Sequence, residues 1–389
     1  MRIGIVAPEF PPEIGGMQTY ALEFSRELAS RGYEVCVFTR PHDAGEAEIP
    51  GIRVIPVLAG RRHLDRRILG GYQIDVWHVM NAAYSWLALE TAPVIISVHG
   101  NDFLRPYIPV ERPNLGRLPG LWRSKKWVPG IEATLGHWLT HRTVRKSLPK
   151  ARHIIANSRY TEKVLLEHYS ACRGKTSAGM VGVSPEYLQA GVSTRHPGMT
   201  SLVSVARLAE PRKNIDLVLR ALSGLRDKYD FTYTIVGDGW LRPTLESLAR
   251  ELGLADRVCF KGFTSSGELK DILERCDLFV LISSIMPGSH EGFGIAYLEA
   301  NACGSPVLAA RLAGAAEAVN EGLSGMFVEE ITVPAISKAL DRFLSGQICF
   351  DPSACRDFAS RFTWKRVVDH AIEFYSPAKA ELGAREPVA

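Results

Sequence analysis

The fold is decided by the stretch Leu278-Phe-Val-Leu-Ile-Ser-Ser-Ile-Met-Pro-Gly-Ser-His-Glu291-Gly-Phe-Gly-Ile-Ala-Tyr-Leu-Glu299. It predicts an apolar strand, a loop with glycines and then a helix, which is the repeating unit of a parallel sheet covered by helices. Ligands of such sheets bind beyond the carboxyl ends of the strands, where the next helix begins with free N–H groups. The stretch therefore predicts an α/β fold and a place for a phosphate-bearing ligand.

The same alternation of strand and helix patterns extends from this stretch to both ends of the chain. In the first half we expect strands at Arg2–Ala7, Glu34–Thr39, Ile52–Val57, Asp75–Met80, Val94–Val98 and His153–Asn157. In the second half we expect them at Leu202–Ala206, Tyr233–Val236, Arg257–Lys261, Leu278–Ile282, Pro306–Ala310 and Gly325–Val328. Residues 183–199 carry prolines and glycines without periodicity, which predicts a hinge. The expected domains are therefore 1–190, joined by 365–389, and 191–364.

The bulk composition agrees with two domains. The chain has 389 residues, of which 46% are hydrophobic and 23% charged, and this is too long for a single core. The N-terminus lacks the long apolar run of a secretion signal, and no apolar run reaches the roughly 20 residues of a membrane span. Seven scattered cysteines form no Cys-x-x-Cys pair, which favours reduced thiols. We therefore expect a cytoplasmic protein.

The two carboxylates Glu291 and Glu299 are the first candidate ligand contacts. On a helix, eight residues separate them by about 12 Å along the axis and roughly 80° around it. That separation suits one extended ligand, such as a sugar nucleotide with hydroxyl groups at both ends. From spacing alone, a helix-surface role for Glu299 and a dipole-favouring role for Glu291 stay open.

A second strand, loop and helix start carries cations in the run Leu202-Val-Ser-Val-Ala-Arg207-Leu-Ala-Glu-Pro-Arg-Lys213-Asn-Ile-Asp. Arg207 and Lys213 are placed to neutralise a departing nucleoside diphosphate, with Asn214 as the expected helix cap. The chain has no Asp-x-Asp motif, so we expect neither a metal nor another cofactor. Solvated loop cations remain the alternative, more so for Arg212 than for Lys213.

These motifs together resemble the retaining glycosyltransferases of family GT4, which have the GT-B fold. The resemblance rests on Arg207 and Lys213, the Gly237-Asp-Gly turn, Glu291-Gly-Phe-Gly and Glu299. It also includes Pro11-Pro-Glu-Ile-Gly-Gly-Met-Gln-Thr-Tyr and Ser97-Val-His99-Gly-Asn-Asp, and so covers nearly all of the chain. It implies two Rossmann-like α/β domains that face a central cleft, with the C-terminal helix returning to the N-terminal domain. The donor would bind mainly to the C-terminal domain and the acceptor mainly to the N-terminal one.

The resemblance also implies a role for each site residue. The catalytic set would be His99, Glu291, Arg207 and Lys213, and the remaining donor contacts would be Gly15, Gly16, Gly292, Phe293, Gly294, Ile295 and Glu299. In this set the two basic residues hold the diphosphate, Glu291 the sugar hydroxyls and Glu299 the ribose. Without the resemblance, His99 is equally well a packed residue at a strand end. The chain departs from the family at Val181-Gly-Val-Ser184 and at Ala315-Ala316-Glu317.

For the reaction, the resemblance implies transfer of a hexose with retained anomeric configuration. The chain looks most like bacterial mannosyltransferases for lipids or surface polysaccharides, including lipopolysaccharide. We therefore expect a GDP-sugar such as GDP-mannose and a glycolipid, lipid-linked or polysaccharide acceptor. A UDP-sugar donor with a small soluble acceptor stays open.

The region from Arg105 to Arg152 is the only indication of the acceptor. It holds eleven basic residues against Glu111 and Glu132, with Trp122, Trp127 and Trp138 among them. This composition suits peripheral contact with an anionic membrane surface, at the inner face of the cell membrane, although an ordinary solvated helix face is an equal alternative.

Three other classes of protein compete with this interpretation. A nucleotide-sugar 2-epimerase shares the two-domain architecture but lacks the combined cation and glutamate pattern. A non-catalytic binding protein of the same fold is expected to have lost His99 or one of the glutamates. Nucleic-acid binding would need an aromatic signature that the chain lacks.

Overall fold

The computed structural model describes residues 1–12, 15–42, 48–91, 93–106, 128–189, 191 and 198–376, with the main chain alone for 128–135. The chain forms two compact units: Met1–Met180 together with the segment that starts at Trp364, and Val181–Thr363. The first division thus lies at Met180, earlier than the expected boundary at residue 190. The reason is local pairing, because the N–H group of Val183 donates to the carbonyl oxygen of Phe362 at 2.9 Å. Both residues belong to the second unit.

A seven-stranded parallel sheet forms the centre of the first unit in the described residues, in the order β3-β2-β1-β4-β5-β6-β7. The strands are β1 (Arg2–Val6), β2 (Glu34–Thr39), β3 (Ile52–Pro56), β4 (Val76–Val79), β5 (Val94–Val98), β6 (His153–Ala156) and β7 (Thr176–Ala178). The six expected strands are all present. Strand β7 was not expected, since its three small residues are only partly buried and carry no apolar pattern.

The helices of the first unit, over the same residues, are α1 (Gly16–Ser30), α2 (Arg62–Leu69), α3 (Asn101–Leu104), α4 (Val128–Ser147), α5 (Arg159–His168) and α14 (Trp364–Ile372). Short 3₁₀ helices are η1 (Ala82–Leu89), η3 (Leu148–Lys150) and η4 (Ser170–Cys172). Helix α14 packs against α1, and Arg31 forms an ion pair with Asp369 at 2.7 Å. The buried hydroxyl of Tyr375 bonds His78 Nδ1 at 2.7 Å. The C-terminal segment therefore completes the core of the first unit.

The second unit has, among its described residues, a six-stranded parallel sheet in the order β10-β9-β8-β11-β12-β13. Its strands are β8 (Thr200–Val205), β9 (Phe231–Val236), β10 (Val258–Gly262), β11 (Leu278–Leu281), β12 (Val307–Ala310) and β13 (Gly325–Val328). From β8 the chain builds outward to β10 and then crosses back to β11. The strand order therefore reverses between β8 and β11, which is the position where such sheets bind ligands.

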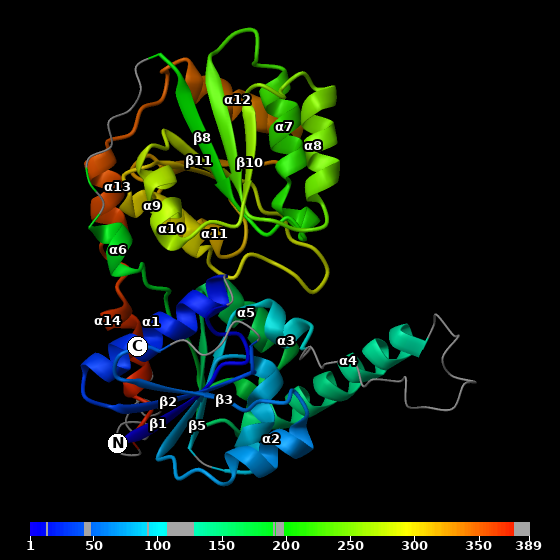
Figure 1. Ribbon diagram of the computed structural model, residues 1–389, viewed down its shortest axis with the longest axis vertical. Coiled ribbons are helices and arrows are strands. Elements are labelled where there is room, and N and C mark those ends of the chain that lie inside the picture. The colour runs from blue at the N-terminus through cyan, green and yellow to red at the C-terminus, as the bar shows by residue number, and fades with distance from the viewer. Residues whose placement is uncertain are drawn as a thin grey trace, which may run out of the picture. The chain divides into compact units, whose positions relative to one another are not determined.

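Helices cover both faces of this second sheet (Figure 1). The helices of this unit, in its described residues, are α6 (Pro185–Leu188), α7 (Ile215–Ser223), α8 (Arg242–Glu251), α9 (Ser266–Glu274), α10 (Ile295–Ala302), α11 (Ala315–Ala318), α12 (Val333–Leu344) and α13 (Pro352–Ala359), with the 3₁₀ turn η5 (Pro211–Lys213). In Figure 1, α7 and α8 lie on one side of the strands and α9 and α10 on the other. Strands β11 and β12 are buried throughout, which explains their continuous apolar sequences.

Candidate functional site

The loops that follow β8 and β11 meet at the point where the strand order reverses, and Asn214 joins them. Its backbone is left-handed, with φ 52°. Its side-chain amide donates to the carbonyl oxygen of Ile282 at 2.7 Å and to that of Arg212 at 3.1 Å. Asn214 is the N-cap residue of helix α7, as expected, but its side chain makes no cap hydrogen bond, because its amide holds the two loops together.

The carboxylate of Glu291 is the centre of a buried cluster in these loops. Its Oε2 atom accepts hydrogen bonds from Lys213 Nζ at 2.6 Å and from Ser283 Oγ at 2.9 Å, and it lies 3.4 Å from Arg212 Nη1. Burial alone would raise the pKa of Glu291. The charges of Lys213 and Arg212 and the two hydrogen bonds outweigh it and lower the pKa to about 2. Glu291 is therefore a fixed anion at neutral pH.

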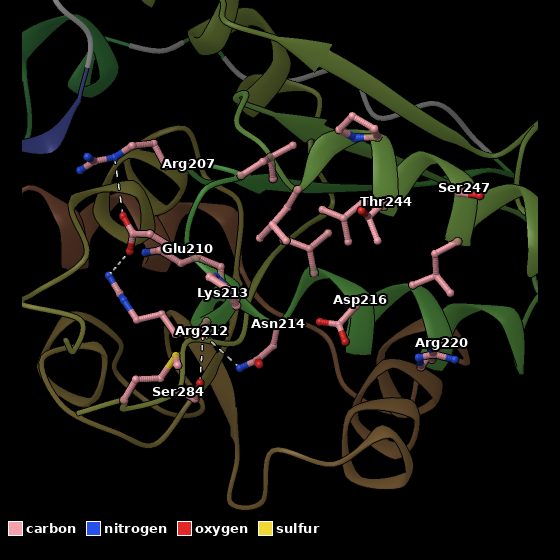
Figure 2. Close-up of a pocket in the computed structure, with 18 of the residues that line it drawn as sticks. Arg207, Glu210, Arg212, Lys213, Asn214, Asp216, Arg220, Thr244, Ser247 and Ser284 are labelled. Carbon is pink, nitrogen blue, oxygen red and sulfur yellow. Dashed lines mark hydrogen bonds and ion pairs between the residues drawn. The ribbon is translucent and has the colours of Figure 1, made fainter. Parts of the chain in front are cut away.

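Arg212 extends the cluster toward Arg207. Its guanidinium is buried and lies 2.5 Å from Glu210 Oε2, while Arg207 Nε lies 3.6 Å from Glu210 Oε1 (Figure 2). The five side chains thus form one row in which cations and carboxylates alternate.

The sequence analysis kept a solvated loop cation as the alternative, above all for Arg212, and the structure excludes it there, because only 6% of the Arg212 side chain is exposed. A signal was present in the sequence. Glu210 stands two residues earlier, and Pro211 between them favours a tight turn that brings the carboxylate and the guanidinium together.

The glycines after Glu291 allow a close approach of two backbone segments. Gly294 has φ 94°, and a Cβ atom there would lie 2.3 Å from the ring of Tyr297. Gly314, which the sequence analysis did not single out, packs against Gly292: a Cβ atom there would lie 2.1 Å from its carbonyl oxygen. The Gly314 N–H group also donates to the carbonyl oxygen of Glu291 at 3.0 Å. Gly314 therefore supports the loop that carries Glu291.

The last expected donor contacts lie in and before helix α10. Phe293 is a buried core residue whose ring packs edge-on against Phe362 at 5.7 Å. Ile295 is the first residue of α10, so its N–H group belongs to the free first turn of that helix.

Glu299 lies one helical turn or more beyond these residues and is buried in α10. Burial and the nearby charge of Glu186 raise its pKa to about 7. No hydrogen bond or ion pair connects the Glu299 carboxylate to Glu291 in the described residues. Within the described residues the Glu299 carboxylate therefore lies outside the row of charges around Glu291.

In the first unit, Gly15 and Gly16 lie at the start of helix α1, which follows the carboxyl end of β1. A Cβ atom at Gly15 would lie 2.6 Å from Gln18 Oε1, so a side chain would not fit without a shift. The position offers the N–H groups of a 15-residue helix.

His99 follows strand β5 in the same unit. Its N–H group donates to Asp102 Oδ1 at 2.8 Å, and its ring contacts Tyr20 edge-on at 4.6 Å. Burial lowers the pKa of His99 to about 4, so the imidazole is neutral at pH 7. Its Nε2 atom is buried and makes no hydrogen bond within the described residues. Asp102 also accepts from the N–H group of Ala82 at 2.9 Å and so fixes the loop around His99.

Comparison with known proteins decides between the classes that the geometry allows. The model described as Glycosyltransferase Family 4 matches residues 14–178, and the model described as Glycosyl transferases group 1 matches residues 193–361. Between them the two models span both units of the chain. The chain belongs to glycosyltransferase family GT4.

The relatives of this chain include enzymes whose names give a substrate. A D-inositol 3-phosphate glycosyltransferase of Mycolicibacterium smegmatis is 26% identical over 411 residues, covering 96% of this chain and 89% of the relative. A GDP-mannose-dependent alpha-(1-6)-phosphatidylinositol monomannoside mannosyltransferase of the same organism is 28% identical over 368 residues, covering 88% of each chain. Among solved structures, sucrose-phosphate synthase from Thermosynechococcus elongatus matches with a TM-score of 0.74 at 18% identity, covering 96% and 98% of the two chains. These matches confirm a glycosyltransferase of GT-B fold.

A cavity of about 940 Å³ adjoins the row of alternating cations and carboxylates. Of the predicted site residues it is lined by Arg207 and Lys213, and it continues between α7 and α8 past Asp216, Thr244 and Ser247 (Figure 2). The predicted glycines and Glu299 do not line it. Within the described residues no group of three or more His, Cys, Asp and Glu side chains could hold a metal ion.

Proposed function

We propose that this glycosyltransferase moves a hexose, with retention of anomeric configuration, from a nucleotide-diphosphate sugar to a glycolipid, lipid-linked or polysaccharide acceptor. The observation that carries this proposal is the row of charges at the strand-order reversal of the second sheet. Three cations face two carboxylates there, so one positive charge remains for a phosphate group. Preorganised cations of this kind stabilise a leaving diphosphate without reorganising during the reaction.

In this proposal Lys213 and Arg207 bind the diphosphate, and Glu291 accepts hydrogen bonds from the hydroxyl groups of the transferred sugar. The lowered pKa of Glu291 makes it a poor proton acceptor for catalysis and a good hydrogen-bond acceptor. Neutral His99 is able to donate or accept a hydrogen bond but not to supply a proton as an imidazolium. The incoming hydroxyl group then gives its proton to the leaving phosphate oxygen on the same face of the sugar. The step needs no metal and no covalent intermediate.

GDP-mannose is the donor that we favour, since one of the relatives uses it by name and is similar along most of its length. A UDP-sugar with a small soluble acceptor is the second candidate, and its acceptor half is supported by the D-inositol 3-phosphate glycosyltransferases among the relatives.

Thermal unfolding with GDP-mannose, GDP, UDP-glucose and UDP tests the donor class, because a bound ligand raises stability by mass action. We expect stabilisation by GDP-mannose and GDP. Stabilisation by the uridine nucleotides alone would favour the second candidate, and stabilisation by none of the four would contradict a nucleotide-sugar site. Incubation of the donor alone, followed by analysis of the sugar, detects an epimerase.

For the acceptor, we propose that helix α4 contacts an anionic membrane surface at the inner face of the cell membrane. Residues 107–127, with much of the basic region, lie outside the described residues. In the described part of α4, Trp138 and Leu139 are 55% and 50% exposed, and Arg142 lies over the Trp138 ring at 5.4 Å. Exposed apolar side chains beside cations suit the lipid headgroup boundary. No described helix has the length and apolar character of a membrane span.

Co-sedimentation with vesicles tests this surface. We expect binding to vesicles with anionic lipid, a loss of binding in Trp138→Ser/Leu139→Ser, and little binding to neutral vesicles. Binding that is indifferent to anionic lipid would remove the membrane proposal and leave the transfer reaction untouched.

A further inference from the structure

Glu210 stands between two arginines whose surroundings differ. Its Oε2 atom lies 2.5 Å from Arg212, whose side chain is 6% exposed, and its Oε1 atom lies 3.6 Å from Arg207, whose side chain is 62% exposed (Figure 2). One carboxylate therefore makes a buried ion pair and a solvent-exposed ion pair at the same time.

The two ion pairs differ in how easily they break. A buried pair is costly to break, because the remaining charge is left without a partner in a poorly solvated place. An exposed pair contributes little, because water and salt screen it. The other terminal nitrogen of the Arg212 guanidinium, Nη1, lies 3.4 Å from Glu291 Oε2. Arg212 thus fixes Glu210, while Arg207 is able to leave Glu210 for another anion.

Any phosphate group that binds Arg207 has to compete with Glu210. The competition matters most after transfer. When the bond between the sugar and the terminal phosphate oxygen breaks, the electron pair stays on that oxygen, which takes the proton of the acceptor hydroxyl and then releases it to the solvent at neutral pH. The nucleoside diphosphate then carries more negative charge than the diphosphate of the donor, so cations hold the product more strongly than the substrate.

We propose that Glu210 is a positioning residue that competes for Arg207 and thereby weakens binding of the nucleoside diphosphate product, and that Arg212 holds Glu210 in the place where it does so. This inference rests on the proposed function, in which Arg207 binds the diphosphate.

The test compares Glu210→Gln with wild type by calorimetric titration of inorganic pyrophosphate, GDP and UDP. Glutamine keeps the size of the side chain and removes its charge. We expect Kd to fall about two- to fivefold, in keeping with the strength of an exposed ion pair. In steady-state transfer, product inhibition strengthens and the donor KM falls, while kcat does not rise. In an Arg207→Ala background the effect of Glu210→Gln on Kd disappears.

Asp341→Asn is the matched control. Asp341 forms an ion pair with Lys228 at 2.5 Å, and Lys228 follows α7 at the end of the sheet opposite to the loops of the site. Asp341→Asn changes the net charge by the same amount as Glu210→Gln, and we expect it to leave the Kd of all three ligands unchanged. If Glu210→Gln does not fold, Glu210→Asp serves instead: it keeps an anion for Arg212 and withdraws it from Arg207.

The outcomes separate this inference from the proposed function. Unchanged or weaker binding by Glu210→Gln, together with weaker binding by Arg207→Ala, overturns the competition and keeps the diphosphate site. Wild-type affinity in Arg207→Ala overturns the diphosphate site itself.

Discussion

At the scale of single residues, Lys213 and Glu291 form an ion pair, but we expect the loss of Glu291 to destabilise the fold more than the loss of Lys213. Glu291 also has Arg212 and Ser283 as partners, so it remains satisfied when Lys213 is removed. Removal of the Glu291 charge, by contrast, takes one carboxylate partner from buried Arg212 and one from Lys213, whose side chain is 12% exposed. Activity and stability are therefore separable at Lys213 and coupled at Glu291.

We expect Lys213→Ala to lower kcat about 10²- to 10³-fold, the typical effect of removing one charge-stabilising contact. The midpoint of urea unfolding should stay close to that of wild type. For Glu291→Gln we expect a similar loss of activity and a loss of stability of about 3–5 kcal/mol, as for one partner of a buried ion pair. Lys228→Ala, which removes an exposed ion pair, is the control. Wild-type turnover in Lys213→Ala would remove the site.

Glu299 makes a second residue-scale prediction, because burial raises its pKa to about 7. A carboxylate has to be ionised to accept hydrogen bonds from both ribose hydroxyl groups. We expect the affinity for a nucleotide sugar to rise as the pH increases from 6 to 8, and Glu299→Gln to abolish this dependence. The intact nucleotide sugar is the probe, since its esterified phosphates do not titrate in this range. A flat profile for the wild type in calorimetric titration would contradict the ribose role.

The same raised pKa has a cost in stability. Between about pH 4.5 and 7 the unfolded chain releases the Glu299 proton before the folded one, so the contribution of Glu299 to stability falls as the pH rises through this window.

The sequence predicted three of the five side chains in the row of charges, but not how deeply each one is buried. Motif spacing pointed to Arg207, Lys213 and Glu291, which the structure places in one row of charges. Arg212 was missed because a pattern of local charges does not show which of two adjacent cations turns inward. That choice depends on Glu291, 79 residues later in the chain.

At the scale of elements, the strand-loop-helix from β11 to α10 depends on Gly294. Its positive φ of 94° and the 2.3 Å from a Cβ atom to the Tyr297 ring are two separate obstacles to a side chain. Tyr297 has little freedom to move, since it is fully buried and its hydroxyl donates to the carbonyl oxygen of Leu281 at 3.0 Å.

We expect Gly294→Ala to destabilise the second unit by more than the 1–2 kcal/mol of a left-handed alanine and to weaken donor binding. Gly322→Ala is the matched control: its φ is 78°, but a Cβ atom there would have no neighbour within 4 Å. Both variants place an alanine at positive φ, but only Gly294→Ala also brings a Cβ atom against Tyr297. The difference between their thermal unfolding midpoints therefore measures the effect of the contact with Tyr297. Equal losses of stability would show that Tyr297 moves aside freely.

Most strands could be predicted at this scale, because a parallel strand that is buried on both faces has an apolar sequence throughout. Strand β7 lies at the edge of the first sheet and is only partly buried, so its sequence lacks that signal.

At the scale of the whole molecule, buried histidines make stability depend on pH. Burial lowers the pKa of His78 and His153 to about 3 and that of His99 and His290 to about 4. Each of these folded-state values lies below the unfolded value of 6.5. The stabilising contribution is therefore complete above pH 6.5 and is lost progressively as the pH falls, because the unfolded chain takes up the protons.

We expect the first unit, which holds His78, His99 and His153, to lose stability first in acid. Asp102 opposes them, since burial raises its pKa to about 6. Near pH 5 the unfolded chain binds about three more protons on these histidines, and the folded chain binds about one more on Asp102. The difference of about two protons lowers the free energy of unfolding by about 2–3 kcal/mol for each pH unit of acidification. Hydrogen exchange at pH 7.5, 6.5 and 5.5 should show earlier opening in residues 48–106 than in residues 231–310. His63→Gln, at an exposed position, should not alter this order.

The attachment of the C-terminal segment has a consequence for the order in which the protein is made. Residues 181–363 are continuous in sequence, so the ribosome releases everything that the second unit needs in one run. The first unit is different: Trp364 and Tyr375 are buried in it, and Tyr375 is the partner of His78. During synthesis, residues 1–180 therefore lack these two core side chains until the second unit has been translated. The half of the molecule that is made first is thus the half that is finished last.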